Sequence, residues 1–401
     1  MRDRRLFSTL CARREATLND TYRWPRIAAL ALACTVGVGL TVAMISQSFH
    51  LDPWLQGRDD FLGFYAGARL VGGPHLYDPA AVRAVQTQAV GEAHEIKYGR
   101  IPFFALVLKP LAWLPYHTAH AVWALLLAAA FAAFIALWPG VAASTRWLIC
   151  CWSLPAFVSL FNSQDDVVLL LWIALAARLL RADKPVAAGL VLALCASKFH
   201  LVGLVPLVIL VQRRWRMAGG LALGVVVLLA LSFAVAGWGW PARYYAVLAN
   251  PEMSTGADHM PNLHSLFWGL GAAGMPLQIA AALLLVAGLF LAARATSDFE
   301  APLALALVTG VLVGFHGYLA DGALFLPALF IFSTAGYARV PALVLTVPIP
   351  WLLLQCPRPW PVVAQALMVA LAAAGFAWIM KRQPGQREPA GIGAANPQVQ
   401  S

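Results

Sequence analysis

Residues 27–46 read IAALALACTVGVGLTVAMIS, and this stretch decides the class of fold. About 20 apolar residues in a helix span the roughly 30 Å hydrocarbon core of a bilayer. The chain of 401 residues is 61% hydrophobic and 11% charged, whereas soluble domains are typically about 45–50% apolar. The residues after Ser46 lack the small-residue cleavage site of a secretory signal, so the helix is expected to stay in the protein. The sequence therefore predicts an integral membrane protein.

Further apolar runs along the chain give, with the first helix, about 12 predicted transmembrane crossings. The runs cover residues 118–138, 146–161, 165–181, 185–197, 200–212, 217–237, 273–293, 301–315, 318–336, 340–355 and 361–380. An even number of crossings predicts both termini on one side of the membrane. The expected fold class is an all-α polytopic membrane protein.

The polar segments divide the chain into three predicted regions. Residues 1–26 form a basic N-terminal segment, residues 27–380 the transmembrane domain, and residues 381–401 a Gly-, Pro- and Gln-rich tail expected to be disordered. In this topology most of the 28 Lys and Arg residues lie on the side of the N-terminus, which the positive-inside rule makes cytoplasmic. Because the basic residues form no continuous face, the net charge of +10 does not indicate a nucleic-acid partner.

A polar segment, residues 50–100, follows the first helix and is predicted to form a long external loop. Within it, FLGFYAGARLV (61–71) and PAAVRAVQTQAV (79–90) show helical spacing with one apolar face, which predicts two interfacial helices. The next run, IPFFALVLKPLAWLP (101–115), is short and is interrupted at Lys109-Pro110. This pattern favours a re-entrant helix over an ordinary crossing.

Polar and ionisable side chains gather near the predicted outer ends of the helices. Such groups are costly near a bilayer, so a functional role is their default explanation. They are Asp59 and Asp60 after the first helix, NSQDD (162–166) in a tight turn, Lys198 and His200 at a break in an apolar run, PNLHSL (261–266) in a large loop, and HGYLAD (316–321) in another turn.

Each of these groups also has a structural explanation. Asp59 and Asp60 would cap the helix that follows them, and Asp165 and Asp166 would cap the next one. Lys198 would extend its ammonium to the membrane interface. The further structural alternatives are packing roles for His200 and His264 and surface ion pairs for Arg58, Arg69 and Arg100.

The order of the motifs resembles glycosyltransferase family 87. DFLGFYAGARLVGGPHLYDP (60–79) is similar to the family's first-loop signature, in which an Asp precedes an aromatic segment and a Gly-rich turn leads to LYD. The motifs that follow in the family's order are RIPFFALVLKPLAWLPYHTAHAVW (100–123), NSQDD, SKFHLVGLVPLVILVQRRWR (197–216), MPNLHSL and HGYLAD. The chain departs from the pattern at Arg100-Ile101-Pro102, where Tyr-Pro-Pro is commoner, at Phe199, where Pro is frequent, and at Asp59, an extra acid.

The resemblance implies a GT-C type transmembrane bundle with its active site on the external face of the bacterial inner membrane. It implies transfer of a sugar, with mannose as the best-known case, from a polyprenyl-phosphate donor to a lipid or glycan acceptor. Asp60 is the expected base, with Asp59 in reserve, because a nearby carboxylate takes the acceptor proton as the glycosidic bond breaks. Direct displacement inverts the anomeric carbon. No metal or other cofactor is required by this interpretation.

The remaining site residues follow from the same resemblance. Positioned cationic groups stabilise a departing phosphate, and the candidates for this role are His316, Lys198, His200 and Arg100. The candidates for sugar or acceptor binding are Tyr65, Gln164, Asp165, Asn262, His264, Tyr318 and Asp321.

Two other functions remain open at the level of sequence. One is a transporter or flippase of lipid-linked sugars, and the other is a non-catalytic subunit of an envelope complex. A transporter requires paired polar sites near the bilayer midplane. The polar groups here are predicted at the outer ends of helices, which favours an enzyme.

Overall fold

The computed structural model of the chain describes residues 2–49, 51–92, 96–250 and 259–381, with side chains from residue 25 onward. These ranges form helices and turns, and no strand occurs among them. The predicted all-helical class is confirmed. The predicted tail, residues 381–401, lies outside the described ranges apart from Lys381.

Six helical segments are long and apolar enough to cross a membrane, which makes the chain a multi-pass membrane protein. They are Pro25–Ser48 within α1 (Arg2–Ser48), α6 (Tyr116–Leu137), Pro185–Val202, α13 (Trp215–Ala236), Gly271–Ala295 and α21 (Trp360–Lys381). Pro185–Val202 combines α10 (Pro185–Ala193), the 3-10 helix η2 (Leu194–Lys198) and α11 (Phe199–Val202). Gly271–Ala295 combines the 3-10 helix η5 (Gly271–Ala273) with α16 (Gly274–Ala295). The helix predicted over residues 27–46 is confirmed.

The predicted number of crossings, about 12, is too high for the part of the chain that the structure describes. Two bent helix pairs raise the six spans to eight at most. These are α8 (Leu154–Phe161) with α9 (Asp166–Arg181), bent by 119°, and Gly336–Thr346 with Ile349–Gln355, bent by 63°. Three further apolar segments, Pro102–Trp113, Glu300–Val313 and Leu319–Phe332, have only 10–17 residues, less than a crossing needs.

The excess of predicted transmembrane crossings has a physical cause. Helix α17 (Glu300–Val313) has Ala301 through Leu312 buried inside the protein. A helix that is apolar on every side is compatible with lipid and with the centre of a bundle alike. Counting apolar runs therefore assigned buried central helices to the membrane.

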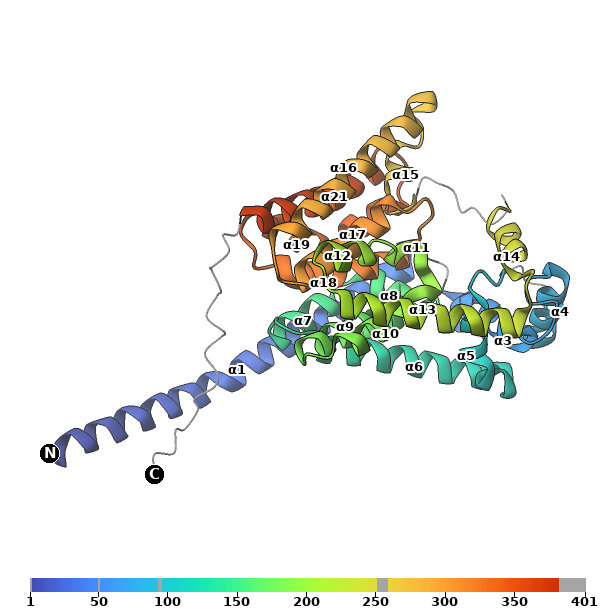
Figure 1. Cartoon of the computed structure of the whole chain (residues 1–401). Coiled ribbons are helices and arrows are strands. Elements are labelled where there is room, and N and C mark those ends of the chain that lie inside the picture. Colours follow the sequence, from blue (N-terminus) through green and yellow to red (C-terminus); the bar gives the residue numbers. More distant parts are fainter. Residues whose placement is uncertain (1, 50, 93–95, 251–258, 382–401) are drawn as a thin grey trace.

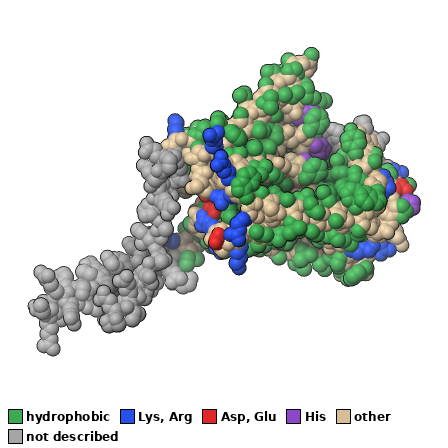
Figure 2. All heavy atoms as spheres, in the orientation of Figure 1, with side chains coloured by type: hydrophobic (Ala, Val, Ile, Leu, Met, Phe, Trp, Pro, Cys, Tyr) green, Lys and Arg blue, Asp and Glu red, His purple; other side chains and the backbone are tan. Residues whose placement is uncertain are grey.

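Shorter elements complete the fold. They are α7 (Ala143–Cys151), α12 (Val205–Val211), α14 (Trp240–Leu248), α15 (Leu263–Phe267), η6 (Leu319–Phe325), α18 (Leu326–Phe332), η7 (Gly336–Ala338), α19 (Arg339–Thr346), α20 (Ile349–Leu352) and η8 (Leu353–Gln355). Helices α4 and α14 lie at one end of the molecule, and the N-terminal part of α1 extends away from the opposite end (Figure 1). Hydrophobic side chains cover most of the face seen in Figure 2, and charged side chains gather toward its two ends. This distribution is that of a protein whose middle faces lipid.

The segment predicted as an external loop, residues 50–100, forms α2 (Asp52–Leu55), α3 (Asp60–Leu70) and α4 (Pro79–Val90). The expectation of an interfacial helix over 61–71 is not met, because Phe61 through Ala68 of α3 are all buried. Gly67 lets the Tyr98 ring lie directly on α3, where an added Cβ would collide with the ring. Helix α4 buries only Val82 and Gln86, as expected for a helix at the surface.

The run at 101–115 forms α5 (Pro102–Leu108) and the 3-10 helix η1 (Lys109–Trp113). The helix type changes at Lys109, whose ammonium donates to the backbone carbonyls of Arg69 (3.4 Å) and Val71 (3.2 Å). This short element therefore packs as part of the first-loop region.

Glycines bring the central helices into close contact. An added Cβ on Gly310 of α17 would collide with the carbonyl oxygen of Leu201 in α11. Likewise, a Cβ on Gly189 of α10 would collide with the Met217 carbonyl of α13. Small residues allow membrane helices to approach backbone to backbone. These contacts hold the end of η2, which carries Lys198, against the centre of the bundle.

Candidate active site

Asp59 is the N-cap of α3, and its carboxylate is fully engaged. Oδ1 accepts a hydrogen bond from the Phe61 amide at 3.0 Å, and Oδ2 accepts one from Ser163 Oγ at 2.8 Å. The His120 Nε2 atom also lies 2.8 Å from Oδ2. The residue is only 2% exposed. Asp59 therefore has the helix-capping role that the sequence left open, and it also joins α3 to α6 and to the turn after α8.

Asp60, the first residue of α3, is less constrained. Its Oδ2 atom accepts one hydrogen bond, from Asn162 Nδ2 at 2.9 Å, and the residue is partly exposed. Burial raises the pKa of Asp60 to about 6, and the positive charge of Arg100 opposes that shift only in part. A carboxylate with this pKa is ionised at neutral pH and still a better proton acceptor than an ordinary Asp.

The turn between α8 and α9 supplies most of the partners. Ser163 adopts a positive φ of 54°, a conformation uncommon outside glycine, and the Trp123 indole donates to its carbonyl at 3.0 Å. Arg100 Nη2 donates to Gln164 Oε1 at 3.2 Å and to Asp165 Oδ1 at 2.9 Å. The sharp turn thus aims its side chains at α3 on one side and at Arg100 on the other.

Arg100 is a fixed positive charge beside Asp60. Its guanidinium lies over the Phe64 ring of α3, 5.2 Å from the ring centroid. Burial alone would lower the pKa of Arg100, but the carboxylates of Asp165, Asp166 and Asp60 together raise it above its ordinary value. Nη1 also donates to the Gly99 carbonyl at 3.3 Å, and the side chain is 14% exposed.

Lys198, at the end of η2, lies among three carboxylates. Its ammonium is 2.6 Å from Asp166 Oδ1, 2.8 Å from Asp321 Oδ1 and 3.6 Å from Asp165 Oδ1. The Lys198 side chain is 3% exposed. Removing one partner of such a buried cluster is costly, because an uncompensated charge then remains. The ammonium joins α9, η2 and η6.

Tyr318 and Asp321 shape the far side of this cluster. Asp321 Oδ2 accepts from the Tyr318 amide at 2.6 Å, which closes the first turn of η6. The His316 ring stands edge-on to the Tyr318 ring at 4.7 Å. His316 is partly exposed, and burial lowers its pKa below the usual value. The imidazole is therefore mainly neutral at pH 7, with N–H donor capacity retained.

Asn262, the N-cap of α15, and His264, in the first turn of that helix, lie on another side of the site. Asn262 caps that helix by accepting from the Ser265 amide at 3.0 Å, and its Nδ2 donates to the Gly314 carbonyl at 2.9 Å. His264 Nδ1 is 3.1 Å from Gln278 Oε1. The His264 ring packs 4.2 Å from the Phe315 ring. Both residues thus hold the 314–316 segment that presents His316.

Two predicted site residues take no part in these hydrogen bonds. The Tyr65 hydroxyl donates to the Leu114 carbonyl at 2.9 Å, and the residue is 7% exposed. His200 is exposed on α11, with its ring edge-on to Phe199 at 5.8 Å. Neither is hydrogen bonded to the carboxylates in the part of the chain that the structure describes.

The structure brings together five segments that are distant in sequence: the start of α3, Arg100, the turn 162–166, Lys198 and η6. Sequence reasoning missed His120, Asn162 and Ser163 as partners of the two first-loop acids. Asn162 and Ser163 stand in the NSQDD turn, and a tight polar turn beside two acids was a usable signal. His120 offered none, because it is a single histidine at the start of an apolar helix.

The profile of glycosyltransferase family 87 matches residues 101–327. The match covers more than half of the chain. The chain belongs to glycosyltransferase family 87. It is therefore a membrane glycosyltransferase, a transferase of the EC 2.4 type that uses a sugar donor and an acceptor. No curated protein and no solved structure matches this chain.

The matched region contains most of the candidate site of this glycosyltransferase but begins one residue after Arg100. Asp59, Asp60 and Arg100 lie outside it, and their connection to it rests on the contacts with Asn162, Ser163 and Asp165 described above. No group of three or more His, Cys, Asp or Glu side chains within the described ranges is arranged to hold a metal ion.

Proposed function

We propose that this family 87 glycosyltransferase transfers a sugar, mannose in the leading case, from a polyprenyl-phosphate donor to an acceptor on the external face of the bacterial inner membrane. The proposal rests on the different surroundings of two adjacent acids, Asp59 and Asp60. Asp59 is buried and saturated with hydrogen bonds, whereas Asp60 is partly exposed and has a raised pKa of about 6. This leaves Asp60 as the base.

The proposed reaction is a direct displacement. The acceptor hydroxyl oxygen forms a bond to the anomeric carbon while the bond from that carbon to the donor phosphate oxygen breaks. The acceptor proton passes to Asp60 as its acidity rises in the transition state. The bonding electron pair leaves with polyprenyl phosphate, so the sugar carbon is inverted.

Two groups are proposed to receive the charge that develops on the phosphate. Arg100 is a permanent cation beside Asp60, and a guanidinium binds phosphate oxygens through paired N–H groups. His316 is partly exposed. Among the described residues, its ring packs against one other aromatic ring, that of Tyr318. Positioned donors of this kind stabilise a leaving group without reorganisation.

Lys198 is proposed to act indirectly. Its ammonium already contacts three carboxylates and is 3% exposed, so direct phosphate binding would require it to leave those partners. We propose that it holds Asp165 and Asp321, which in turn orient Arg100 and the Tyr318 turn. Gln164, His264 and Tyr318 are proposed to contact the sugar, whereas Asn262 is 0% exposed and holds the 314–316 segment in place.

Transfer assays with purified protein in detergent test the proposal. Wild-type protein is incubated with radiolabelled polyprenyl-phosphate mannose and candidate acceptors, and the labelled glycoside is measured beside Asp60→Asn and His316→Ala. We expect transfer by wild type, loss with Asp60→Asn and a reduced rate with His316→Ala. Full activity of Asp60→Asn would show that Asp60 is not the base. Uptake of label into sealed vesicles without a new glycoside would instead identify a transporter.

A further inference from the structure

Helix α14 (Trp240–Leu248) begins at the end of a membrane-spanning helix. The span α13 has 22 residues, or about 33 Å at roughly 1.5 Å per residue, which matches the roughly 30 Å hydrocarbon core of a bilayer. Gly237 ends α13 with a positive φ of 71°, and in Figure 1 the chain then turns, so that α14 runs across the end of α13. Helix α14 therefore starts at the depth of the membrane interface.

Close contacts hold the first turn of α14 against the last turn of α13. The rings of Trp238 and Trp240 pack 5.0 Å and 5.6 Å from the ring of Phe233. The Arg243 guanidinium donates to the Ala236 carbonyl at 2.6 Å. Because these contacts join the two helices directly, α14 cannot stand away from the membrane surface in bulk water.

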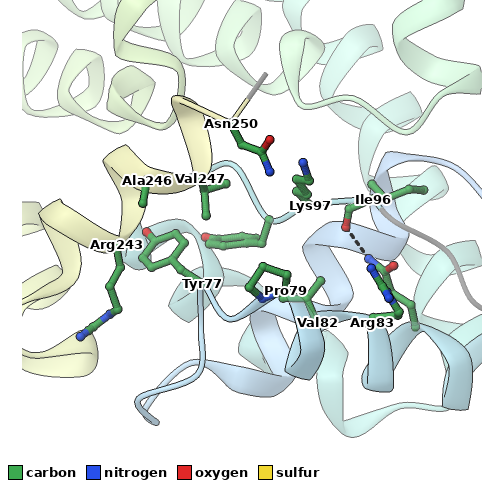
Figure 3. A pocket seen from close by; sticks show the side chains of 12 residues that line it. Tyr77, Pro79, Val82, Arg83, Ile96, Lys97, Arg243, Ala246, Val247 and Asn250 are labelled. Carbon is green, nitrogen blue, oxygen red and sulfur yellow. Dashed lines mark hydrogen bonds between the residues drawn. The ribbon is translucent and has the colours of Figure 1, made fainter. Parts of the chain in front are cut away.

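Helix α14 has two faces of opposite character. Its inward face lines the cavity drawn in Figure 3 with Arg243, Ala246, Val247 and, just beyond the helix, Asn250. These positions recur every three or four residues, as one side of a helix does. The sequence of α14, WPARYYAVL, has one charged residue, and that residue, Arg243, lies on this inward face.

The outward face of α14 is apolar apart from one hydroxyl group. It consists of Pro241, Ala242, Tyr245, Leu248 and Ala249, all of them exposed. Tyr245 is 72% exposed, and the neighbouring Trp238 is 86% exposed. A helix at a water-facing surface has the opposite arrangement, with apolar side chains inward and polar side chains outward. The outward face of α14 therefore fits surroundings that are less polar than water.

Helix α4 lies at the same end of the molecule (Figure 1) and has the arrangement expected in water. Its Val82 side chain is buried, and the polar Thr87 and Gln88 side chains are exposed. The apolar outward face of α14 is thus a property of that helix and not of this whole end of the protein.

From these observations we propose that the outward face of α14, together with Trp238, binds the lipid interface of the bilayer and anchors this end of the protein in it. Trp and Tyr are enriched at membrane interfaces, where the ring contacts lipid and the polar atom contacts water. Interfacial helices bury an apolar face about 5–10 Å into the boundary between headgroups and acyl chains. The proposal requires neither a sugar donor nor an acceptor, so it is independent of the proposed reaction.

Continuity with the span favours lipid over another protein as the partner of this face. Large apolar side chains of α13, among them Val226 and Leu231, are exposed along the span, as is expected of residues that contact lipid. Helix α14 starts where that exposed surface ends, and its outward face continues the apolar character of the span into the interface.

The anchor is connected to the candidate active site through two tyrosines. The Tyr244 ring of α14 packs 5.7 Å from the Tyr77 ring, and the Tyr77 hydroxyl donates to the Arg100 carbonyl at 2.8 Å. Fixing α14 in the interface would therefore hold the segment that carries Arg100 close to the membrane surface.

Photocrosslinking of the full-length protein in lipid nanodiscs tests the proposal. Tyr245 is replaced by the photoreactive residue p-benzoylphenylalanine, and the matched control carries the same residue in place of Gln88 on α4. Both native side chains are exposed, so each variant should melt as wild type does. The nanodiscs contain phosphatidylethanolamine and phosphatidylglycerol, and mass spectrometry of the intact protein counts lipid adducts after irradiation.

We expect several-fold more lipid adduct from position 245 than from position 88. Equal yields from the two positions, or the absence of lipid adducts from position 245, would overturn the proposal. A crosslink from position 245 to a second copy of the chain would also overturn it, because the outward face would then be a contact between protein subunits.

Trp238 supplies an independent measurement. Its fluorescence is obtained as the difference between wild-type protein and Trp238→Phe in the same nanodiscs. Brominated lipid should quench this emission strongly, and aqueous iodide should quench it weakly, although other protein atoms leave the side chain 86% exposed. Strong quenching by iodide without quenching by brominated lipid would put Trp238 in water and reject the anchor.

Discussion

The Asp60 carboxylate accepts a hydrogen bond from the Asn162 side-chain amide at 2.9 Å, across 102 positions of the chain. This bond joins the start of α3 to the turn between α8 and α9, and it is accompanied by the bond from Ser163 to Asp59. An amide partner stabilises a carboxylate less than a cation does, so Asp60 is held in place with its basicity preserved.

Replacing Asp60 should separate the two first-loop acids. With the proposed base removed, Asp60→Asn should lower the transfer rate by about 10²–10⁴-fold. Asp59→Asn keeps a residue type that is favoured at N-caps and should retain a larger share of activity. Initial rates at saturating donor measure both. A greater loss with Asp59→Asn would assign the base to the other acid.

The pH dependence of transfer should report the same group. As the proposed base, Asp60 would act when ionised. Because burial raises its pKa to about 6, the rate should rise with pH through about 6 and level off above it. Because burial lowers the pKa of His316 from its ordinary value toward that of Asp60, the profile is also measured with His316→Ala, which should retain the limb. Rates between pH 4.5 and 8 measure the profile. A rate that is already constant from pH 4.5 upward would contradict the role of Asp60.

Asp60→Asn should also make the folded protein more stable at neutral pH. The pKa of Asp60 is raised from 3.8 to about 6, so the folded state binds the proton more tightly than the unfolded state does. The protonated Asp60 carboxyl contributes fully to the free energy of unfolding below about pH 4, and this contribution is lost as pH rises through about 6. A neutral amide avoids that loss, by up to about 3 kcal/mol at pH 7. Thermal melting should show the gain at pH 7 and not at pH 4.

Lys198→Met should destabilise the protein, because three carboxylates lose the ammonium that they surround. Breaking a buried charge cluster typically costs about 3–5 kcal/mol. Lys184→Met is the matched control, since Lys184 is exposed and should leave melting unchanged. Melting temperature and transfer are measured together. A variant that melts like wild type but has lost donor binding would instead favour direct phosphate contact by Lys198.

Gly310→Ala should disrupt the centre of the bundle. The added methyl group would collide with the Leu201 backbone carbonyl, and overpacking of this kind costs about 1–3 kcal/mol. Gly219→Ala is the control, because nothing lies within 4 Å of the added atom on α13. The yield of monodisperse protein and its melting temperature measure the difference. Equal behaviour of the two variants would show that α11 and α17 can move apart.

The sequence predicted the helical membrane class and the enzyme family, because both depend on long-range composition and motif order. It overestimated the number of crossings, since α17 is apolar through burial in protein and not through contact with lipid. The helix at 61–71 was misplaced for the same reason. Hydrophobicity reports exclusion from water and does not distinguish what excludes it.

The sequence was enough to predict which acids belong to the candidate site, but not which side chains they bond to. Asp59, Asp60, Asp165 and Asp321 are conspicuous in an apolar chain, and the structure brings them near one another. The sequence could not assign Lys198 to three carboxylates, because contacts across α9, η2 and η6 depend on how the helices cross. His120 was missed because its only distinctive property is its distance of 2.8 Å from Asp59.

The segment 96–101 limits which substitutions this enzyme can accept in evolution. The Tyr98 ring packs on Gly67 of α3, while Arg100, two residues later, donates to the Asp165 carboxylate. A substitution in this segment alters both neighbourhoods at once. Because one substitution there disturbs both the packing on α3 and the neighbourhood of Asp165, this segment is expected to change more slowly in evolution than the exposed positions of α4.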